Sequence, residues 1–224
     1  MSIVHTYYEP VPDIDQGIQQ NEIAVWRDSW ERWGWECKVL GRADVVITPD
    51  ELARLQRLPS VNPPGYDLAC YLRWFAMRAL GGGLMSDYDV VNVGMRPGDT
   101  GAFFEKASIQ VLCHGGVPCV VETVGHGAAD WCDYMLGYEP TEADTFEGRA
   151  HVSDQTIMQR LNAPGIAGCD LCREPQHADG RTRLIHLSHN AMHAMGLDHA
   201  FHRHEVMQVL AQLGAGRADA HIRE

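Results

Sequence analysis

The chain has 224 residues and a mass of 24.9 kDa, enough to bury a hydrophobic core without disulfide staples. Apolar residues make up 45% of the sequence and charged residues 21%, which excludes a disordered chain, a collagen and a coiled coil. The basic and acidic residues give a net charge of 18 − 30 = −12, which argues against nucleic acid or an anionic membrane as the main partner.

The seven cysteines follow no regular spacing, and the first residues, MSIVHTYY, lack the basic and apolar segments of a secretion signal. No apolar run is long enough to cross a bilayer. We therefore expect a cytoplasmic protein with reduced thiols and no transmembrane segment.

Apolar periodicity and turn residues predict alternating strands and helices along the chain. In chain order these are a strand at 3–8, a helix at 17–33, strands at 37–40 and 45–47, helices at 48–58 and 66–80, strands at 84–91, 109–113 and 117–124, a helix at 153–161, a strand at 184–187 and a helix at 199–213. Gly165, Gly168 and Pro175 indicate a loop between the helix at 153–161 and the strand at 184–187. This alternation predicts a single α/β domain, with a mixed central sheet and helices on both of its faces.

Two carboxylates stand at the centre of the sequence, where a helix, three glycines and a strand run into Asp87 and Asp89. In an extended strand, residues two apart point to the same side, so we expect these carboxylates to converge. Mg²⁺ and Mn²⁺ prefer oxygen ligands and complete their shell with substrate phosphates. The alternative interpretation is that both residues are solvated turn acids.

The wider pattern of Arg73, Gly82-Gly83 and Asp87-x-Asp89 resembles the core of metal-dependent glycosyltransferases with the GT-A fold, especially the family 32 sugar-transferase group. The opening Ile3–Tyr7 resembles that family's nucleotide-binding strand, and the Trp-rich stretch 29–36 resembles its Ser-Trp segment. The resemblance covers roughly residues 1–95. The chain departs from the family at Cys70, where an Asp is usual, and at Met85, where a Tyr is usual.

This resemblance implies a single GT-A-like (Rossmann-like) nucleotide-diphospho-sugar transferase domain over 1–224. The nucleotide-sugar and metal half would be 1–95, the donor-sugar and acceptor half 96–198, and the C-terminal helix and tail 199–224. It implies a hexosyltransferase that uses Mn²⁺ or Mg²⁺ to move a sugar from a UDP-sugar to an acceptor hydroxyl, with retention of configuration. The acceptor stays open between a glycan, a protein, a small molecule and a modified DNA base.

Two later segments extend the resemblance toward family 8 enzymes. The stretch 152–156 resembles an Asp-Gln segment, which places Asp154 and Gln155 with Arg73 as catalytic residues at the transferred sugar. The stretch 185–189 resembles a late histidine segment, so Asp87 and Asp89 would hold the metal with His186, and His189 is the competing ligand. The resemblance assigns binding of the nucleotide sugar to Tyr7, Tyr8, Asp67, Arg73, Gly82, Gly83 and Asp87.

Each assignment has a structural alternative. Arg73 can simply pair with a neighbouring acid, and Ser153 can cap a helix next to a solvated Asp154. Seven of the twelve histidines lie from 186 onward, so any one of them can be a surface residue.

Two other functions remain open from the sequence. Asp87-Tyr-Asp89-Val-Val also fits the Asp-x-Asp motif of a haloacid-dehalogenase-like phosphohydrolase, with Asp87 as the nucleophile and Asp89 as the acid/base. A non-catalytic zinc-binding module is the third class, because Cys169-x-x-Cys172 with His177 could start a zinc site. A second Cys pair at the proper spacing is missing, so the alternative is free thiols in a loop.

Overall fold

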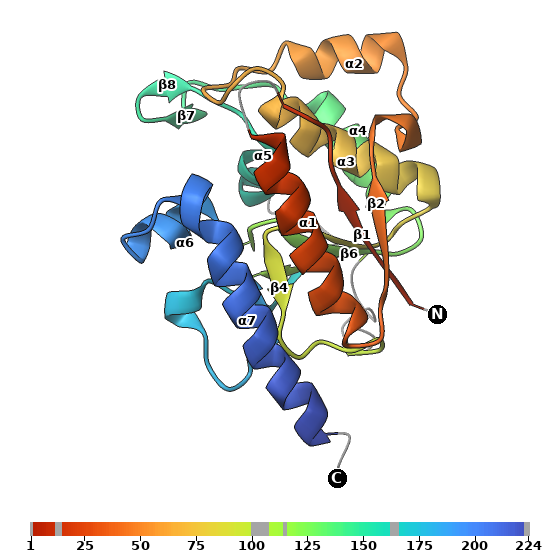
Figure 1. Cartoon of the computed structure of the whole chain (residues 1–224). Helices are drawn as coiled ribbons and strands as arrows, with labels where there is room; N and C mark the ends of the chain where they lie inside the picture. Colours follow the sequence, from red (N-terminus) through yellow and green to blue (C-terminus); the bar gives the residue numbers. More distant parts are fainter. Residues whose placement is uncertain (1, 12–14, 100–107, 114–115, 162–165, 222–224) are drawn as a thin grey trace.

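Figure 1 presents the protein as a computed structural model of the whole chain. The structure describes residues 2–11, 15–99, 108–113, 116–161 and 166–221, with the backbone alone at 161, 166–170 and 217–221.

One curled mixed sheet forms the centre of the molecule. Within the described residues its eight strands lie in the order β2-β1-β3-β6-β5-β9-β10-β4. Their bounds are β1 Ile3–Tyr7, β2 Glu36–Leu40, β3 Gly83–Ser86, β4 Val90–Asn92, β5 Ile109–Cys113, β6 Val120–Thr123, β9 Ile166–Arg173 and β10 Leu184–His186. A separate hairpin joins β7 Thr145–Phe146 to β8 Arg149–Ala150.

Helices cover both faces of this sheet, as predicted (Figure 1). Their bounds are α1 Gln16–Glu31, α2 Pro49–Gln56, α3 Tyr66–Leu80, α4 Gly127–Gly137, α5 Asp154–Leu161, α6 His189–Ala194 and α7 His199–His221, with short 3-10 turns η1 Arg42–Asp44 and η3 Pro175–His177. In Figure 1, α1 and α7 lie across the near face, and α3 and α4 lie behind the sheet.

Apolar residues that are adjacent in a strand pack on opposite faces of the sheet, because successive strand residues point in opposite directions. On β3, Leu84 packs into the core beneath α1 and α7, which includes Trp26 and Trp30. The next residue, Met85, packs into the core beneath α3 and α4. β6 repeats the alternation with Val120 in the first core and Val121 in the second.

The short link from β3 to β4 accounts for the curl of the sheet. Ser86 and Val90 are four residues apart, so their Cα atoms are at most about 15 Å apart. β3 and β4 are nevertheless the third and eighth strands of the sheet, and five steps across a flat sheet would separate them by about 24 Å. The sheet must therefore bend round, which brings the end of β3 near β10 and β4.

Most predicted elements are confirmed, including the helix at 66–80 and the helix that was expected to begin at 48, where Thr48 and Glu51 form a capping box. The predicted strand at 45–47 is wrong: these residues follow the 3-10 turn η1, and Val45 and Ile47 pack against the second core without joining the sheet. The loop predicted around Gly168 and Pro175 is wrong, because Gly168 lies in β9 and Pro175 begins η3. Gly165, which the same prediction included, lies outside the described residues.

The strand at 84–91 is also corrected. It is two strands, β3 and β4, with a turn at 87–89 between them. The helix α4 was not predicted, although Ala128, Trp131, Cys132 and Met135 bury one helical face.

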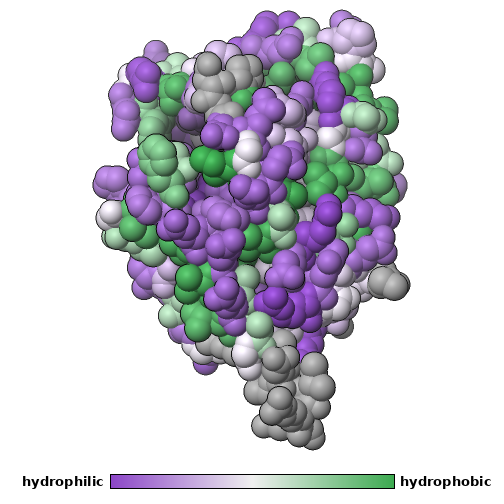
Figure 2. Space-filling view, viewed as in Figure 1, coloured by the Kyte–Doolittle hydropathy of each residue, from purple (hydrophilic) through white to green (hydrophobic). Residues whose placement is uncertain are grey.

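No helix within the described residues combines the length and the apolar character that crossing a membrane requires. The face that carries α1 and α7 is largely hydrophilic in Figure 2, with separate hydrophobic residues between the polar ones.

The glycines after α3 give a prediction about stability. A Cβ on Gly82 would lie 2.8 Å from the carbonyl oxygen of Thr123, and its φ is +102°. Gly81 has a φ of +81°, but a Cβ there would meet nothing within 4 Å. We expect Gly82→Ala to lower the free energy of unfolding by about 1–3 kcal/mol more than Gly81→Ala, because a backbone clash is added to the backbone strain. Urea denaturation of both variants measures the difference, and equal midpoints would contradict this packing.

Candidate functional site

The turn at 87–89 presents two carboxylates from the carboxyl end of β3. The backbone N–H of Asp87 donates to the carbonyl of Cys119 at 2.7 Å, and Val90 N–H donates to the carbonyl of Asp87 at 3.2 Å. These bonds close the chain into a turn, so the two side chains do not converge through strand alternation as the sequence predicted. The turn itself brings them together: both contribute a ligand atom to one compact group.

His186 completes that group. It ends β10, where its register partner is Val90, and the N–H of Leu187 donates to the carbonyl of Asp89 at 3.0 Å. Its Nε2 lies 3.5 Å from Asp89 Oδ1. Potential ligand atoms of Asp87, Asp89 and His186 all lie within 4.8 Å of one another. The curl of the sheet thus joins residues about one hundred positions apart.

Arg73 connects this group to a buried acid on α5. It projects from α3, forms an ion pair with Asp87, and donates to Asp154 Oδ2 from Nε at 3.1 Å and from Nη2 at 2.6 Å. The indole of Trp74 donates to the same oxygen at 2.9 Å, and the other oxygen of Asp154 accepts the N–H of Gln155 at 2.8 Å. The carboxylate of Asp154 is only 5% exposed, so its hydrogen bonds are directed into the protein.

A second arginine holds Asp89 from the opposite side. Arg203 of α7 donates to Asp89 Oδ2 at 3.2 Å and to both oxygens of Glu22 on α1 at 2.7 Å. Glu22 is fully buried. This network fixes one oxygen of Asp89 and leaves the other, Oδ1, facing His186.

Charge and burial shift the pKa values within this group. Burial raises the pKa of Asp87 to about 6, with Arg73 opposing the rise and Asp89 adding to it. Burial favours the neutral ring of His186, but the charge of Asp89, a hydrogen bond with Cys113 and the charge of Asp87 together outweigh it, so that the pKa of His186 rises to about 9. Without a bound cation, Asp89 and His186 therefore form an ion pair.

The group fits a hard divalent cation. Asp89 Oδ1 is buried and makes no hydrogen bond to any residue that the structure describes, which leaves an oxygen lone pair for a ligand. Two carboxylates and one imidazole are a donor set that suits Mn²⁺.

The aromatic residues expected at the nucleotide lie beside this turn or close to the end of β1. Tyr8 stacks edge-on against Tyr88 with ring centroids 6.3 Å apart, and its buried hydroxyl has no hydrogen-bond partner among the described residues. Tyr7 is buried, and its hydroxyl donates to Glu9 at 2.7 Å.

Asp67, in the first turn of α3, accepts hydrogen bonds from Ser60 and Asn62.

The other predicted site residues lie outside the group of potential ligands. Gly82 and Gly83 lie at the amino end of β3, and Asp87 follows its carboxyl end. Gln155 is half-buried at the amino end of α5. His189 is exposed at the start of α6, with its ring centroid 4.3 Å from that of His199, and it is not part of the group of potential ligands.

The sequence interpretation missed Arg203 and Glu22. A detectable signal was present: α1 buries Gln19, Glu22, Ile23, Trp26, Ser29 and Trp30 on one face, and an acid on such a face requires a buried partner. Nothing local to Arg203 identified that partner, because the two residues are separated by most of the chain.

The buried ion pair of Arg73 and Asp154 gives a second prediction. Asp154→Asn preserves the shape of the side chain but leaves Arg73 without one of its two acids. We expect a loss of about 3–5 kcal/mol in the free energy of unfolding, as for other buried pairs broken on one side.

The matched control is Asp28→Asn, which removes an exposed i,i+4 pair with Arg32, where a loss of at most about 0.5 kcal/mol is expected. Chemical denaturation compares the two variants. Equal stability of the two would show that Asp154 does not balance the charge of Arg73.

Comparison with known proteins adds information about the fold. No protein-family model matches the sequence, and no curated protein matches it. Among solved structures, a glycosyltransferase involved in the glycosylation of the major capsid of PBCV-1 matches with a TM-score of 0.52 and 12% identity, over 93% of this chain and 100% of that one. The glycosyltransferase GlyE of Streptococcus pneumoniae TIGR4 aligns with a TM-score of 0.41 and 13% identity, over 75% of this chain and 45% of that one. The likeness to the first structure, which extends over the whole of that chain, shows that this chain has a mixed α/β, GT-A-like fold.

Proposed function

We propose that the protein is a glycosyltransferase that moves a hexose from a UDP-sugar to an acceptor hydroxyl, with a divalent cation and with retention of configuration. The observation that carries the proposal is the convergence of Asp87, Asp89 and His186 on one group of ligand atoms. The GT-A-like fold, which the chain shares with a capsid glycosyltransferase, supports it.

Asp89 and His186 would hold the cation, assisted by Asp87. Asp89 suits this role because Arg203 fixes its Oδ2 and its Oδ1 stays without a hydrogen bond among the described residues. Mn²⁺ or Mg²⁺, when bound, supplies positive charge that stabilises the departing diphosphate.

Arg73 would orient Asp87 and contact the donor. Three of the five N–H donors of its guanidinium are used by Asp87 and Asp154. In this proposal the remaining N–H groups of Arg73 donate hydrogen bonds to the sugar or its phosphates, and Gln155 contacts the same part of the donor. Asp154, which is directed inward, would act by holding Arg73 in place.

The base of the nucleotide would lie near the end of β1. Tyr8 and Tyr88 offer aromatic surfaces beside the acidic turn, and the hydroxyl of Tyr8, which has no partner among the described residues, can form a hydrogen bond with a polar ligand.

In the reaction, the bond from the anomeric carbon to the diphosphate oxygen breaks, and its electron pair stays on the diphosphate. The acceptor oxygen forms the new bond on the face that the diphosphate leaves, and its proton passes to the departing diphosphate. The acceptor is defined in this proposal only as a hydroxyl.

Two features of the turn weigh against a phosphohydrolase. A nucleophilic Asp87 would need a carboxylate free to attack phosphorus, but Asp87 is paired with Arg73. The motif of such a hydrolase also normally ends the first strand of its domain, whereas Asp87 follows β3, the third strand along the chain.

Release of UDP from a panel of UDP-sugars, measured with and without Mn²⁺, tests the proposal directly. We expect Mn²⁺-dependent hydrolysis of at least one donor, and a reduction of about a hundredfold or more in Asp89→Asn, because a metal-held charge contributes several kcal/mol to such a transition state. Asp28→Asn is the surface control.

The same samples distinguish the alternative. Absence of UDP release and of Mn²⁺-dependent UDP binding would refute sugar transfer. Hydrolysis of an aryl phosphate that is lost in Asp87→Asn would indicate a phosphohydrolase instead.

The two candidate histidines give a separate prediction. We expect His186→Ala to weaken Mn²⁺ binding by about tenfold or more, because it removes a ligand atom from the group. His189→Ala should leave the affinity unchanged, since His189 is exposed and outside the group. Titration calorimetry with Mn²⁺ in the presence of UDP measures both. A larger effect from His189→Ala would place the cation elsewhere.

A further inference from the structure

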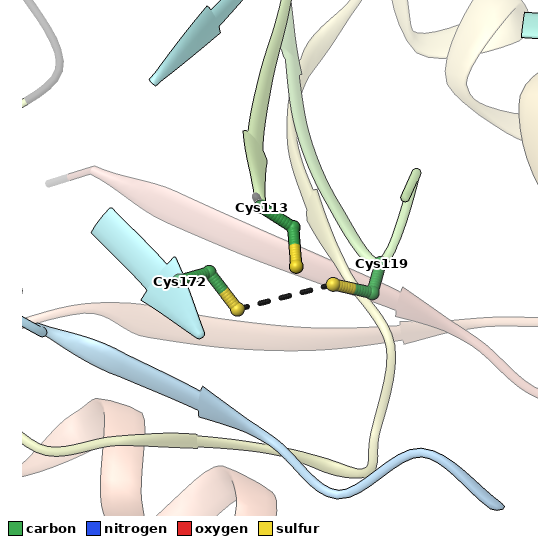
Figure 3. A group of neighbouring side chains, drawn as sticks. All are labelled: Cys113, Cys119 and Cys172. Atoms are coloured by element: carbon green, nitrogen blue, oxygen red, sulfur yellow. Dashed lines mark hydrogen bonds between the residues drawn. The ribbon is translucent and has the colours of Figure 1, made fainter. Parts of the chain in front are cut away.

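A second group of potential metal ligands lies close to the acidic turn and consists only of thiols. Cys113 ends β5, Cys119 precedes β6, and Cys172 lies in β9. β5 pairs with both β6 and β9, and Cys113 is the register partner of Cys172. The three sulfur atoms all lie within 4.8 Å of one another, and Figure 3 shows them pointing toward a common centre.

The spacing of the sulfurs fits a tetrahedral thiolate site. With Zn–S bonds of about 2.3 Å, two sulfurs of a tetrahedron lie about 3.8 Å apart. The Sγ atoms of Cys119 and Cys172 are 3.9 Å apart. A disulfide would need about 2.05 Å and would leave the third thiol unused.

Burial alone does not account for this arrangement. Free cysteines often serve as small apolar side chains, and Cys132, fully buried in the second core, is an example that is not part of the group. The three converging thiols come from separate segments, are at most 5% exposed, and are surrounded by residues of the first core such as Leu112 and Leu184. An apolar shell of this kind excludes water and favours soft thiolate ligands.

We propose that Cys113, Cys119 and Cys172 form a three-thiolate site for a soft divalent cation. Zn²⁺ is the cation that we expect there. This differs from the pair that the sequence suggested. Cys172 is a member, but its described partners come from β5 and from the residue before β6. His177 is exposed in η3, and the side chain of Cys169 lies outside the described residues.

The site would stabilise the strand ends that carry the acidic turn. The carbonyl of Cys119 accepts the backbone N–H of Asp87 at 2.7 Å, and the thiol of Cys113 hydrogen-bonds with His186. The two groups of ligands therefore adjoin, but sulfur donors select a soft ion and carboxylates a hard one. The thiolate ion would have a structural role, distinct from the ion of the proposed transfer reaction, and it does not depend on that reaction.

The test is titration of the reduced, metal-free full-length protein with Cd²⁺, together with the zinc content of the protein as purified. We expect about one zinc per chain and a cadmium–thiolate charge-transfer band at one Cd²⁺ per chain, with an intensity that corresponds to three thiolates. Cys113→Ser, Cys119→Ser and Cys172→Ser should each weaken Cd²⁺ binding by about tenfold or more. The matched control is Cys132→Ser, which should retain the full band.

Two outcomes would overturn the proposal. The first is absence of the thiolate band from the wild-type protein at stoichiometric Cd²⁺, a result that does not depend on whether any variant folds. The second is retention of the full band in all three of Cys113→Ser, Cys119→Ser and Cys172→Ser, which would assign the thiolate ligands to other cysteines. Retention of the band in Asp89→Asn would support a separate site, even if that variant releases no UDP.

Discussion

The pairing of a half-buried acidic turn with two arginines is the constraint on which the site depends. Asp87 is paired with Arg73 and Asp89 with Arg203, and each arginine has a second, buried acid as partner, Asp154 or Glu22. Without these cations, carboxylates so close together and partly buried would repel each other and lose hydration. The arginines come from helices on opposite faces of the sheet, so both layers of the fold act on the same turn.

The curl of the sheet makes this arrangement possible. A three-residue turn joins the third strand to the eighth, which brings His186 on β10 beside Asp89. The converging thiols of β5, β9 and the residue before β6 adjoin the turn, because the carbonyl of Cys119 accepts the backbone N–H of Asp87. The sheet thus assembles two sets of potential ligands, one hard and one soft, whose members are far apart in the sequence.

The sequence predicted the local features well. The caps of α2, the extent of α3 and the division of the sheet between two helical layers follow from turn residues and apolar periodicity. The association of His186 with Asp87 and Asp89 was also anticipated, but from a resemblance. The turn at 87–89 was read as strand because apolar residues flank it on both sides.

The partners of Asp89 and of Cys172 could not be predicted, because they depend on the strand order. Arg203 lies on the last helix, and Cys113 and Cys119 are more than fifty residues before Cys172. The buried acid Glu22 was the one feature that indicated a distant cationic partner, which the structure identifies as Arg203.

The central claim is that the acidic turn and His186 bind one hard cation next to a nucleoside diphosphate. Anomalous diffraction at the manganese absorption edge, from crystals grown with Mn²⁺ and UDP, tests it most directly. The account predicts one anomalous peak within coordinating distance of Asp89 and His186, with the diphosphate against it. A peak at any other place, or UDP bound away from this turn, would contradict the account.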